Sequence, residues 1–232
     1  MGLYISASGI LNAAQRQRVA ANNIANLRTP GYRAARPHSS ATASGGVRMD
    51  AVTRDNASGP VEWTGRPLDL AAGDAFFQVE LPDGTLAYTR DGHFGRNADG
   101  KVVTSSGARL MPPVQVPPDA ASVTVSSDGT VYALRPGDMQ PQQAGRIAVF
   151  RFANTDGLEA RGGNLFVPTA ASGPAQAAAP ETGITPGAVE GSDVNMVREQ
   201  VAGTLNTRTA QANINAFRAQ DDVLGELLDL TQ

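Results

Sequence analysis

The stretch VAANNIANLRTPGYRAARP, Val19 to Pro37, passes within a few residues from a helical pattern to a chain break. Three asparagines, Asn22, Asn23 and Asn26, stand near the end of apolar positions that recur at helical spacing. A Thr-Pro-Gly triplet follows at once. Proline disfavours helical geometry in the residue before it, and glycine permits a positive φ. The sequence therefore predicts a long helix that ends here and a chain that then changes direction.

Both ends of the chain predict long helices. The first runs from Leu3 to Leu27, and the second follows the cap candidates Ser192 and Asp193 and ends at Leu230. At about 1.5 Å per residue, the two helices would be roughly 37 Å and 57 Å long. Each carries apolar residues on more than one face, which requires more than one packing neighbour.

The charges of the two ends are complementary. Residues 1–36 carry five Arg and no acid, whereas residues 192–232 carry six acids and three Arg. We expect the first and last segments to pair as a coiled-coil-like helical hairpin. The alternative is that each helix packs separately on the middle of the chain.

The middle of the chain reads as β structure, because Asp-Gly dipeptides separate short runs of alternating apolar residues. Two stretches of small and polar residues, 34–46 and 169–183, are typical of linkers or long loops. The sequence predicts an α+β fold with a central antiparallel all-β domain of six to nine strands. The expected divisions are an N-terminal helix over 1–36, a linker or extended segment over 37–64, a β domain over 65–186 and a C-terminal helix over 187–232.

The composition and motifs give no support for an enzymatic, metal-binding or nucleic-acid-binding function. The net charge of −3 is too small to indicate a nucleic-acid or membrane-surface partner. The chain has no Cys, and its two histidines, His38 and His93, lack further ligands at metal-binding spacing. No nucleophile elbow or phosphate-binding loop occurs. We expect no enzyme activity, no catalytic residue, no cofactor and no metal. The sequence has no run of 18 apolar residues, so we also expect no membrane insertion.

Long helices with small apolar stripes need a partner surface, because one pair of helices leaves part of the stripes in water. Identical subunits packed side by side would bury them. A head-to-tail contact that does not close on itself produces a helical filament. The sequence therefore favours an assembly protein.

Three blocks of sequence, in this order, resemble the bacterial flagellar basal-body rod and hook protein family. The first is LYISASGILNAAQRQRVAANNIANLRTPGYR (3–33), with its A-N-N-x-A-N element followed by T-P-G-[YF]-[KR]. The second is RPLDLAAGDAFFQVELPDGTLAYTRDGHFGRNADGKVVT (66–104), and the third is the closing helix of 190–230. Within the family, residues 112–131 and 145–175 look most like a distal rod subunit.

The resemblance implies a structural subunit of the basal-body rod, which polymerises into a hollow helical shaft that transmits torque across the periplasm to the hook. It implies that the terminal helices form the inner tube and that the β domain forms the outer layer. The implied partners are further copies of the chain, other rod subunits and the hook, the ring bushing proteins and the flagellar type III export apparatus. Export would then proceed without a cleaved signal peptide, and the N-terminus shows no basic region and cleavage site.

The expected subunit-interface residues are the outward apolar positions of both helices and the three asparagines: Leu3, Ile10, Ala14, Asn22, Asn23, Ile24, Asn26, Val197, Val201, Leu205, Ile214, Phe217, Leu224 and Leu228. The expected chain-turn residues are Thr29, Pro30, Gly31 and Tyr32. The amides can hydrogen-bond to neighbouring subunits or to the chain that leaves the helix. They can also be polar residues at a fraying helix end.

Two other functions remain open on the sequence. One is a proximal rod or hook-type axial subunit of the same family. The other, of a different class, is a secreted β-domain binding module on a helical stalk, for which Trp63 and Tyr88 are the only aromatic candidates. Core or turn packing of these two rings is the simpler interpretation.

Overall fold

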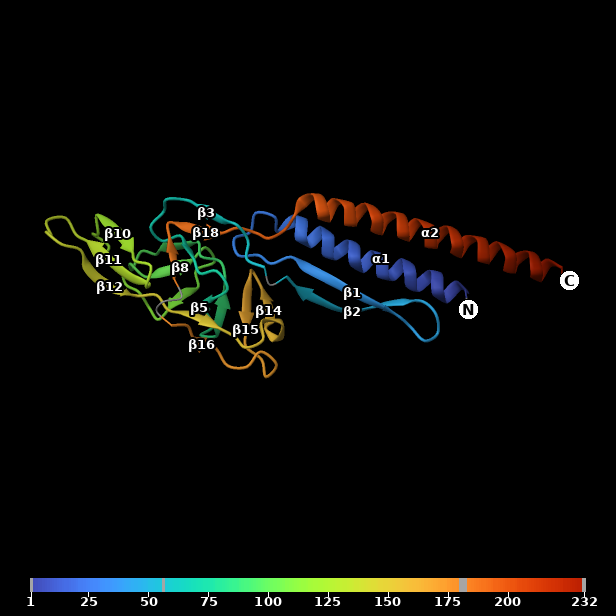
Figure 1. Ribbon diagram of the computed structural model, residues 1–232, viewed down its shortest axis with the longest axis horizontal. Coiled ribbons are helices and arrows are strands. Elements are labelled where there is room, and N and C mark those ends of the chain that lie inside the picture. Colours follow the sequence, from blue (N-terminus) through green and yellow to red (C-terminus); the bar gives the residue numbers. More distant parts are fainter. Residues whose placement is uncertain (1, 56, 180–182, 231–232) are drawn as a thin grey trace. The chain divides into compact units, whose positions relative to one another are not determined.

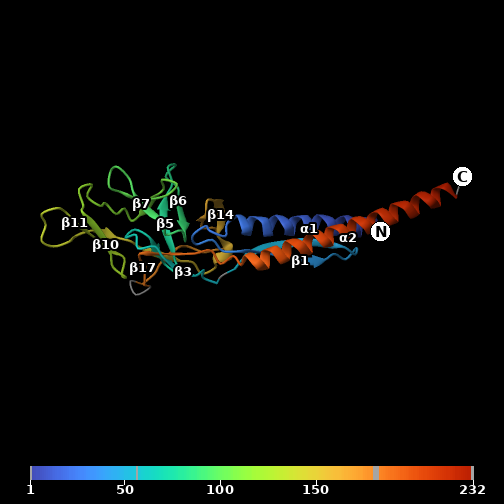
Figure 2. The ribbon, with the colours of Figure 1, turned by 90° about the horizontal axis from the view of Figure 1, so that it is seen from above.

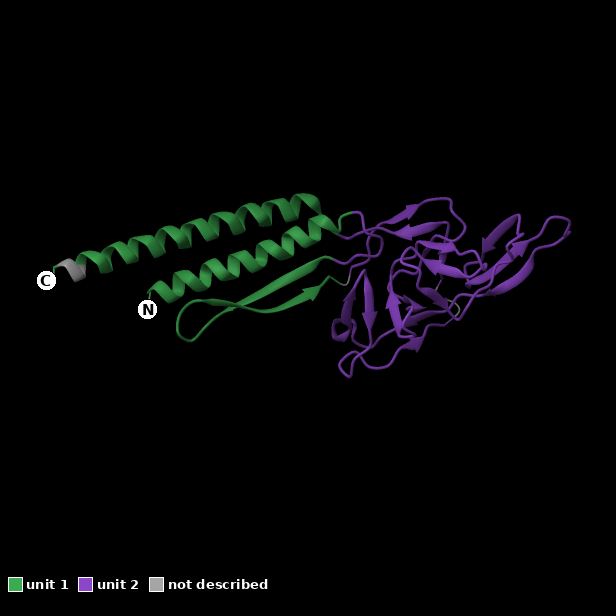
Figure 3. Ribbon diagram, turned by 180° about the vertical axis from the view of Figure 1, so that it is seen from behind, with its two compact units in different colours: residues 1–27, 34–55, 194–232 green, residues 28–33, 56–193 purple. Residues whose placement is uncertain are grey.

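The computed structural model describes residues 2–55, 57–179 and 183–230, with the backbone alone for 227–229. Two helices, α1 (Gly2–Ala25) and α2 (Met196–Asp229), enclose in sequence a region of antiparallel strands, so the α+β fold is confirmed. The chain divides into two compact units, coloured separately in Figure 3. Unit 1 comprises residues 1–27, 34–55 and 194–232, and unit 2 comprises residues 28–33 and 56–193.

In unit 1, α1 and α2 lie side by side and run in opposite directions (Figures 1 and 2). The first helix has 24 residues and the second has 34, or roughly 36 Å and 51 Å. The first helix ends two residues before the expected Leu27. The second begins later than expected, because Asn195 rather than Ser192 or Asp193 caps it: the Asn195 Oδ1 accepts a hydrogen bond of 3.0 Å from the backbone N–H of Arg198.

The faces on which α1 and α2 meet are made of small and polar residues. A Cβ atom added to Gly9 would lie 2.5 Å from the Asn213 side chain, so the two helices approach closely at this glycine. The residues of α1 that are buried are Ser6, Gly9, Asn12, Ala13, Ala20 and Asn23, and those of α2 are Glu199 and Asn206. Within the described residues, neither helix buries an apolar side chain larger than alanine.

The complementary charge expected for segments 1–36 and 192–232 is present as an ion pair between Arg36 and Glu199, but in the described part of the chain no ion pair joins α1 to α2. The arginines of α1, Arg16 and Arg18, are exposed. The close approach of small residues, rather than opposite charge, brings the two helices together.

Unit 1 also contains a hairpin where the sequence predicts a linker. Strands β1 (Ala35–Ala41) and β2 (Val47–Arg54) pair antiparallel, with an irregularity between His38 and Ser39. The hairpin lies along α1: the Ser39 hydroxyl donates to Asn12 Oδ1 at 2.9 Å, and the Ser8 hydroxyl accepts from the backbone N–H of Val47 at 3.1 Å. The linker-like composition of this segment hides the hairpin, because contacts with α1 stabilise it.

Unit 2 is built from short antiparallel strands. Their bounds are β3 (Val61–Trp63), β4 (Leu70–Ala71), β5 (Phe76–Glu80), β6 (Leu86–Thr89), β7 (Phe94–Arg96), β8 (Val102–Thr104), β9 (Arg109–Met111), β10 (Ser122–Val125), β11 (Thr130–Leu134), β12 (Gln142–Arg146), β13 (Val149–Arg151), β14 (Glu159–Gly162), β15 (Leu165–Val167), β16 (Gln176–Ala177), β17 (Thr185–Pro186) and β18 (Ala188–Glu190), with a 3₁₀ turn at Thr155–Gly157. The expected six to nine strands are too few, because strands of two or three residues show no alternation in sequence.

The largest sheet of unit 2 has the order β14-β15-β6-β5-β9-β8-β7, with β13 pairing to β5 and to β16. A second sheet joins β10, β11 and β12. Phe77, Phe94, Leu110 and Ile147 are fully buried between these elements. Unit 2 therefore has an apolar core of its own, whereas the described residues of α1 and α2 bury only small or polar side chains and Glu199.

Candidate assembly surface

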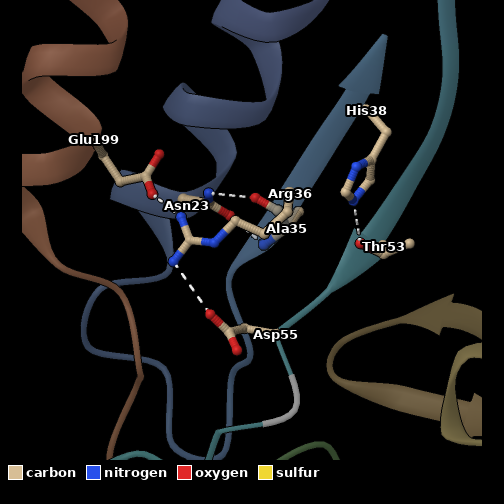
Figure 4. Close-up of polar contacts among 7 residues, drawn as sticks. All are labelled: Asn23, Ala35, Arg36, His38, Thr53, Asp55 and Glu199. Atoms are coloured by element: carbon tan, nitrogen blue, oxygen red, sulfur yellow. Dashed lines mark hydrogen bonds and ion pairs between the residues drawn. The ribbon is translucent and has the colours of Figure 1, made fainter. Parts of the chain in front are cut away.

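Asn23 ties the end of α1 to the start of β1 (Figure 4). Its side chain is 0% exposed and makes two hydrogen bonds to one residue. Nδ2 donates to the Ala35 carbonyl at 2.9 Å, and Oδ1 accepts from the Ala35 N–H at 2.8 Å. The amide thus takes the place that a neighbouring strand would occupy. Of the two functional roles expected for the asparagines, Asn23 has the contact with the chain that leaves the helix.

The other two asparagines lie on the surface of the same turn. The Asn26 amide donates to the Asn22 carbonyl at 2.9 Å, which closes the last turn of the helix. The Asn22 side chain is exposed and that of Asn26 is half-buried. Both remain candidates for contact with a neighbouring subunit.

Arg36 joins the beginning of the hairpin to both its end and α2. Its guanidinium lies 2.8 Å from Glu199 Oε1 and 3.4 Å from Asp55 Oδ2 (Figure 4). Glu199 is in the first turn of α2 and is buried. An acid in the first turn also interacts favourably with the helix dipole. Arg36 and Glu199, which are 163 residues apart in sequence, therefore join the basic segment 1–36 to the acidic segment 192–232, although the sequence did not indicate which charges would pair.

The chain turn after α1 belongs to unit 2. Gly31 has a φ of +65° and donates its N–H to the Glu190 carbonyl at 2.7 Å. A Cβ there would lie 2.6 Å from the carbonyl carbon and oxygen of Arg90. The neighbouring carbonyls are also used: Pro30 O accepts from Asn164 Nδ2 at 2.9 Å, and Tyr32 O accepts from the Asp193 N–H at 3.2 Å. Gly31 is buried, while Thr29, Pro30 and Tyr32 are half-buried.

A buried ion pair follows the turn and was missed in the sequence. The side chains of Arg33 and Glu190 are each about 2% exposed and lie 2.8 Å apart. Glu190 Oε1 also accepts from the Gly59 N–H at 3.0 Å. Burial raises the pKa of Glu190, while the charge of Arg33 opposes the rise. The pair holds residues 28–33 against β18 within unit 2.

Several large apolar side chains of the helices are exposed, away from the small and polar meeting faces. Val197, Val201 and Leu205 are 69%, 54% and 58% exposed and recur every four residues, so they form one outward stripe on α2. On α1, Tyr4, Ile5 and Leu11 are also exposed, and Tyr4 and Leu11 line a hollow with residues 47–49 of β2. Exposed apolar residues in continuous rows mark interaction surfaces.

The expected interface residues lie mainly on these outward faces. The exposed ones are Ala14, Asn22, Ile24, Val197, Val201, Leu205, Phe217 and Leu224; the half-buried ones are Leu3, Ile10, Asn26 and Ile214. Asn23 is buried, and the Leu228 side chain is outside the described residues. Sequence reasoning missed Tyr4, Ile5, Leu11, Met196 and Val223, which are also exposed. Only the spacing of large apolar residues could have indicated them.

The two aromatic candidates for a binding face are separated. Tyr88 is buried in an aromatic cluster, where its ring meets Phe152 edge to face at 4.9 Å. Trp63 is 75% exposed on β3, so its expected core or turn packing is wrong. The two side chains do not form one patch.

Asp91 and its neighbours in unit 2 make hydrogen bonds within a turn. Asp91 Oδ1 accepts from the His93 N–H at 2.9 Å, and burial raises the pKa of Asp91. His93 also lies 3.3 Å from the fully buried Asp69. Across the residues that the structure describes, no group of three or more His, Cys, Asp or Glu is placed to hold a metal ion. Neither described helix has the length and apolar character that a membrane span requires.

Two family models and several known proteins are similar to this chain. Residues 3–33 match the family described as flagella basal body rod protein, and residues 71–133 match the flagellar hook protein FlgE/F/G D1 domain. The flagellar basal-body rod protein FlgG of Caulobacter vibrioides is 34% identical to the chain, over 96% of each. The chain belongs to the flagellar basal-body rod protein family.

Other members of the rod protein family cover the chain equally well. FlgG of Bacillus subtilis is 33% identical over 98% of each chain, and the rod protein FlgF of Escherichia coli is 29% identical over 96% of this chain and 95% of its own. The first family match ends at Arg33, where the buried pair with Glu190 begins. The second lies entirely within unit 2.

Proposed function

We propose that this structural rod subunit belongs to the distal rod and polymerises into a hollow helical shaft that transmits torque to the hook. In this proposal, the paired helices of unit 1 form a coiled-coil-like inner tube, and unit 2 forms an outer layer. The names of the relatives, FlgG above all, support the rod assignment. A proximal rod position is the alternative within the family.

One observation supports polymerisation most strongly: among the described residues, the helix pair buries no apolar side chain larger than alanine. Its buried positions are mainly Gly, Ala, Ser and Asn, while large apolar residues such as Val197, Val201 and Leu205 are exposed. Burying a Val or Leu side chain completely is worth about 1.5–3 kcal/mol. Because Val197, Val201 and Leu205 are about half exposed or more, covering all three would contribute roughly 3 kcal/mol.

A contribution of this size does not hold two copies together alone. Association costs on the order of 4–15 kcal/mol in lost translational and rotational freedom. A subunit in a helical array meets several neighbours, so the contributions of several such faces combine. The free chain would therefore remain monomeric, and assembly would proceed on an existing end.

The proposed partners are further copies of this chain, adjoining rod and hook subunits, ring bushing proteins and the export apparatus. The proposed location is the periplasm-spanning rod, reached by export without cleavage of a signal peptide. No enzyme activity is proposed, because the relatives are named as structural rod proteins.

The test is electron microscopy of basal bodies from a strain that lacks this chain. We expect the rod to stop short and carry no hook, and we expect the intact chain to restore it. A rod of full length in the deletion strain would overturn the proposed function. A rod that stops at its proximal end rather than part-way would favour the proximal alternative.

A further inference from the structure

The C-terminal end of α2 extends past the beginning of α1 (Figures 2 and 3). A Cβ added to Gly2 would lie 2.7 Å from the Gln220 side chain, so the first residue of α1 is level with Gln220. The helix continues to Asp229. Residues 221–229 therefore form an overhang, and at its base Val223 and Leu224 line a hollow with Gly2 and Leu3 while staying about half exposed.

The other half of the helix pair carries a groove. It has a volume of about 670 Å³. Its lining is Gln17, Ala20, Ala21, Ile24, Glu199, Gln200, Gly203, Thr204, Thr207 and Arg208. Two alanines on α1 and a glycine on α2 leave room between the helices at this point. The groove is large enough for side chains such as those of Val223 and Leu224 to enter.

The overhang is acidic throughout. Asp221, Asp222 and Glu226 are exposed, and no Lys or Arg follows Arg218 in the chain. Negative charges near the C-terminus of a helix are unfavourable, because the helix dipole places partial negative charge there. Each such charge costs about 0.3–1 kcal/mol in an isolated helix. A basic partner would reverse this cost.

The exposed charge in the lining of the groove is basic. Arg208 lines the groove and is exposed, and Arg16 and Arg18, on either side of the lining residue Gln17 in sequence, are also exposed; none of the three makes an ion pair within the described chain. The one acid of the helices in this region is Glu199, which is buried and already paired to Arg36 at 2.8 Å. The charge of the groove region is therefore opposite to that of the overhang.

We propose that the overhang of one copy docks in the α1–α2 groove of the next copy, head to tail. Each copy then offers the overhang at one end of its helix pair and the groove at the other. Such a contact does not close on itself, so it extends an open array. The occupant is a second copy of this chain, because the same molecule carries both complementary charges and both apolar surfaces. The inference rests on the proposed rod function and specifies one of its contacts.

The absence of Cys from the chain permits a direct test by disulfide cross-linking. The variant Val223→Cys/Ala21→Cys, expressed as the full-length chain in a strain that lacks its own copy, places one thiol on the overhang and one in the groove. After mild oxidation of isolated basal bodies, we expect a ladder of dimers, trimers and larger species on a non-reducing gel. The matched control is Val223→Cys/Gln15→Cys, in which Gln15 is exposed on α1 outside the groove and is not one of the apolar interface candidates. We expect the control to stay monomeric.

A charge exchange gives a second test that does not depend on disulfide geometry. Asp221→Arg/Asp222→Arg alone and Arg18→Asp/Arg208→Asp alone should each reduce the number of complete rods at least tenfold. The four substitutions together should restore rods to at least half the normal number, because the complementary charges are exchanged between copies. Glu159→Arg, an exposed change of the same sign in unit 2, controls for net charge.

The inference is overturned if rods form but Val223→Cys/Ala21→Cys gives no cross-linked ladder. It is also overturned if the chain with all four charge substitutions builds no more complete rods than either double substitution alone. If the cysteine variant builds no rods, the charge exchange decides alone. These results differ from a failure of the proposed function, in which even the unaltered chain is dispensable for rod formation.

Discussion

Replacing Asn23 by Ala should release the hairpin from the end of α1. The Asn23 amide makes hydrogen bonds of 2.9 Å and 2.8 Å with the backbone of Ala35, and it is fully buried. The substitution leaves the Ala35 N–H and C=O without these partners. A buried polar group that loses its partner costs about 1–3 kcal/mol, so the two together cost roughly 2–5 kcal/mol.

The cost should fall on unit 1 alone, and hydrogen exchange of the full-length chain can locate it. In Asn23→Ala, we expect amides of β1 and β2 to exchange at least 30-fold faster, since 1.4 kcal/mol corresponds to a factor of about 10. Amides of β5 and β6 in the core of unit 2 should keep their protection. The control is Asn22→Ala, at an exposed position on the same turn, where surface substitutions change stability by about 0.5 kcal/mol or less. Equal protection of the hairpin in Asn23→Ala and the unaltered chain would refute the reasoning.

Four further outcomes are expected. Gly31→Ala should destabilise unit 2 by about 2 kcal/mol or more in urea unfolding, because it adds a Cβ at 2.6 Å from the Arg90 carbonyl and at positive φ; an unchanged midpoint would contradict the close approach. Glu190→Gln should cost about 3–5 kcal/mol by the same assay, since Arg33 keeps a buried charge without its partner; Glu62→Gln, an exposed change on the neighbouring strand β3, should cost little. Burial raises the pKa of Asp91 in the folded state above the ordinary 3.8, so the free energy of unfolding falls as pH rises from 3.8 through the raised pKa. Asp91→Asn removes this titration, so we expect it to gain stability relative to the unaltered chain over that range and to show no gain below it. A gain confined to low pH would contradict the prediction. Leu205→Asp should prevent rod assembly and leave the exchange protection of unit 2 intact, and normal motility of that strain would count against the outward stripe as an interface.

Local features of the fold could be predicted from the sequence. The break at Thr29, Pro30 and Gly31 gave the end of the first helix to within two residues, because proline and glycine act on their own backbone and that of the preceding residue. The antiparallel β region was evident from the Asp-Gly turns. The start of α2 was misplaced, since Ser192 and Asp193 are as suitable for a cap as Asn195 and only the structure distinguishes them.

Contacts between distant residues could not be predicted in this way. The pairing of Arg33 with Glu190 and of Arg36 with Glu199 depends on which segments meet, and no local pattern carries that information. The hairpin of β1 and β2 was hidden for a similar reason, because its support comes from α1.

The periodic spacing of apolar residues predicted some features of the helices and not others. Val197, Val201 and Leu205 of the first expected stripe are exposed, whereas Ile214 of the second is half-buried, and the role of both stripes in assembly stays a prediction. The sequence also led to the expectation of charge pairing between the helices, whereas Gly9 and other small residues form the contact. Large apolar residues give a clear periodic pattern in the sequence and small residues do not, although the small residues decide how closely two helices approach.

The most direct measurement concerns the accessibility of the outward stripe before and after assembly. A single thiol introduced by Leu205→Cys into the Cys-free chain can be labelled with a maleimide, and labelling after denaturation gives the total thiol. Leu205 is 58% exposed in the single chain, so we expect complete labelling of the purified monomer and at least tenfold slower labelling in isolated basal bodies. Equal labelling rates in monomer and rod would contradict the account, because the helices would then leave their apolar faces in water within the assembled shaft.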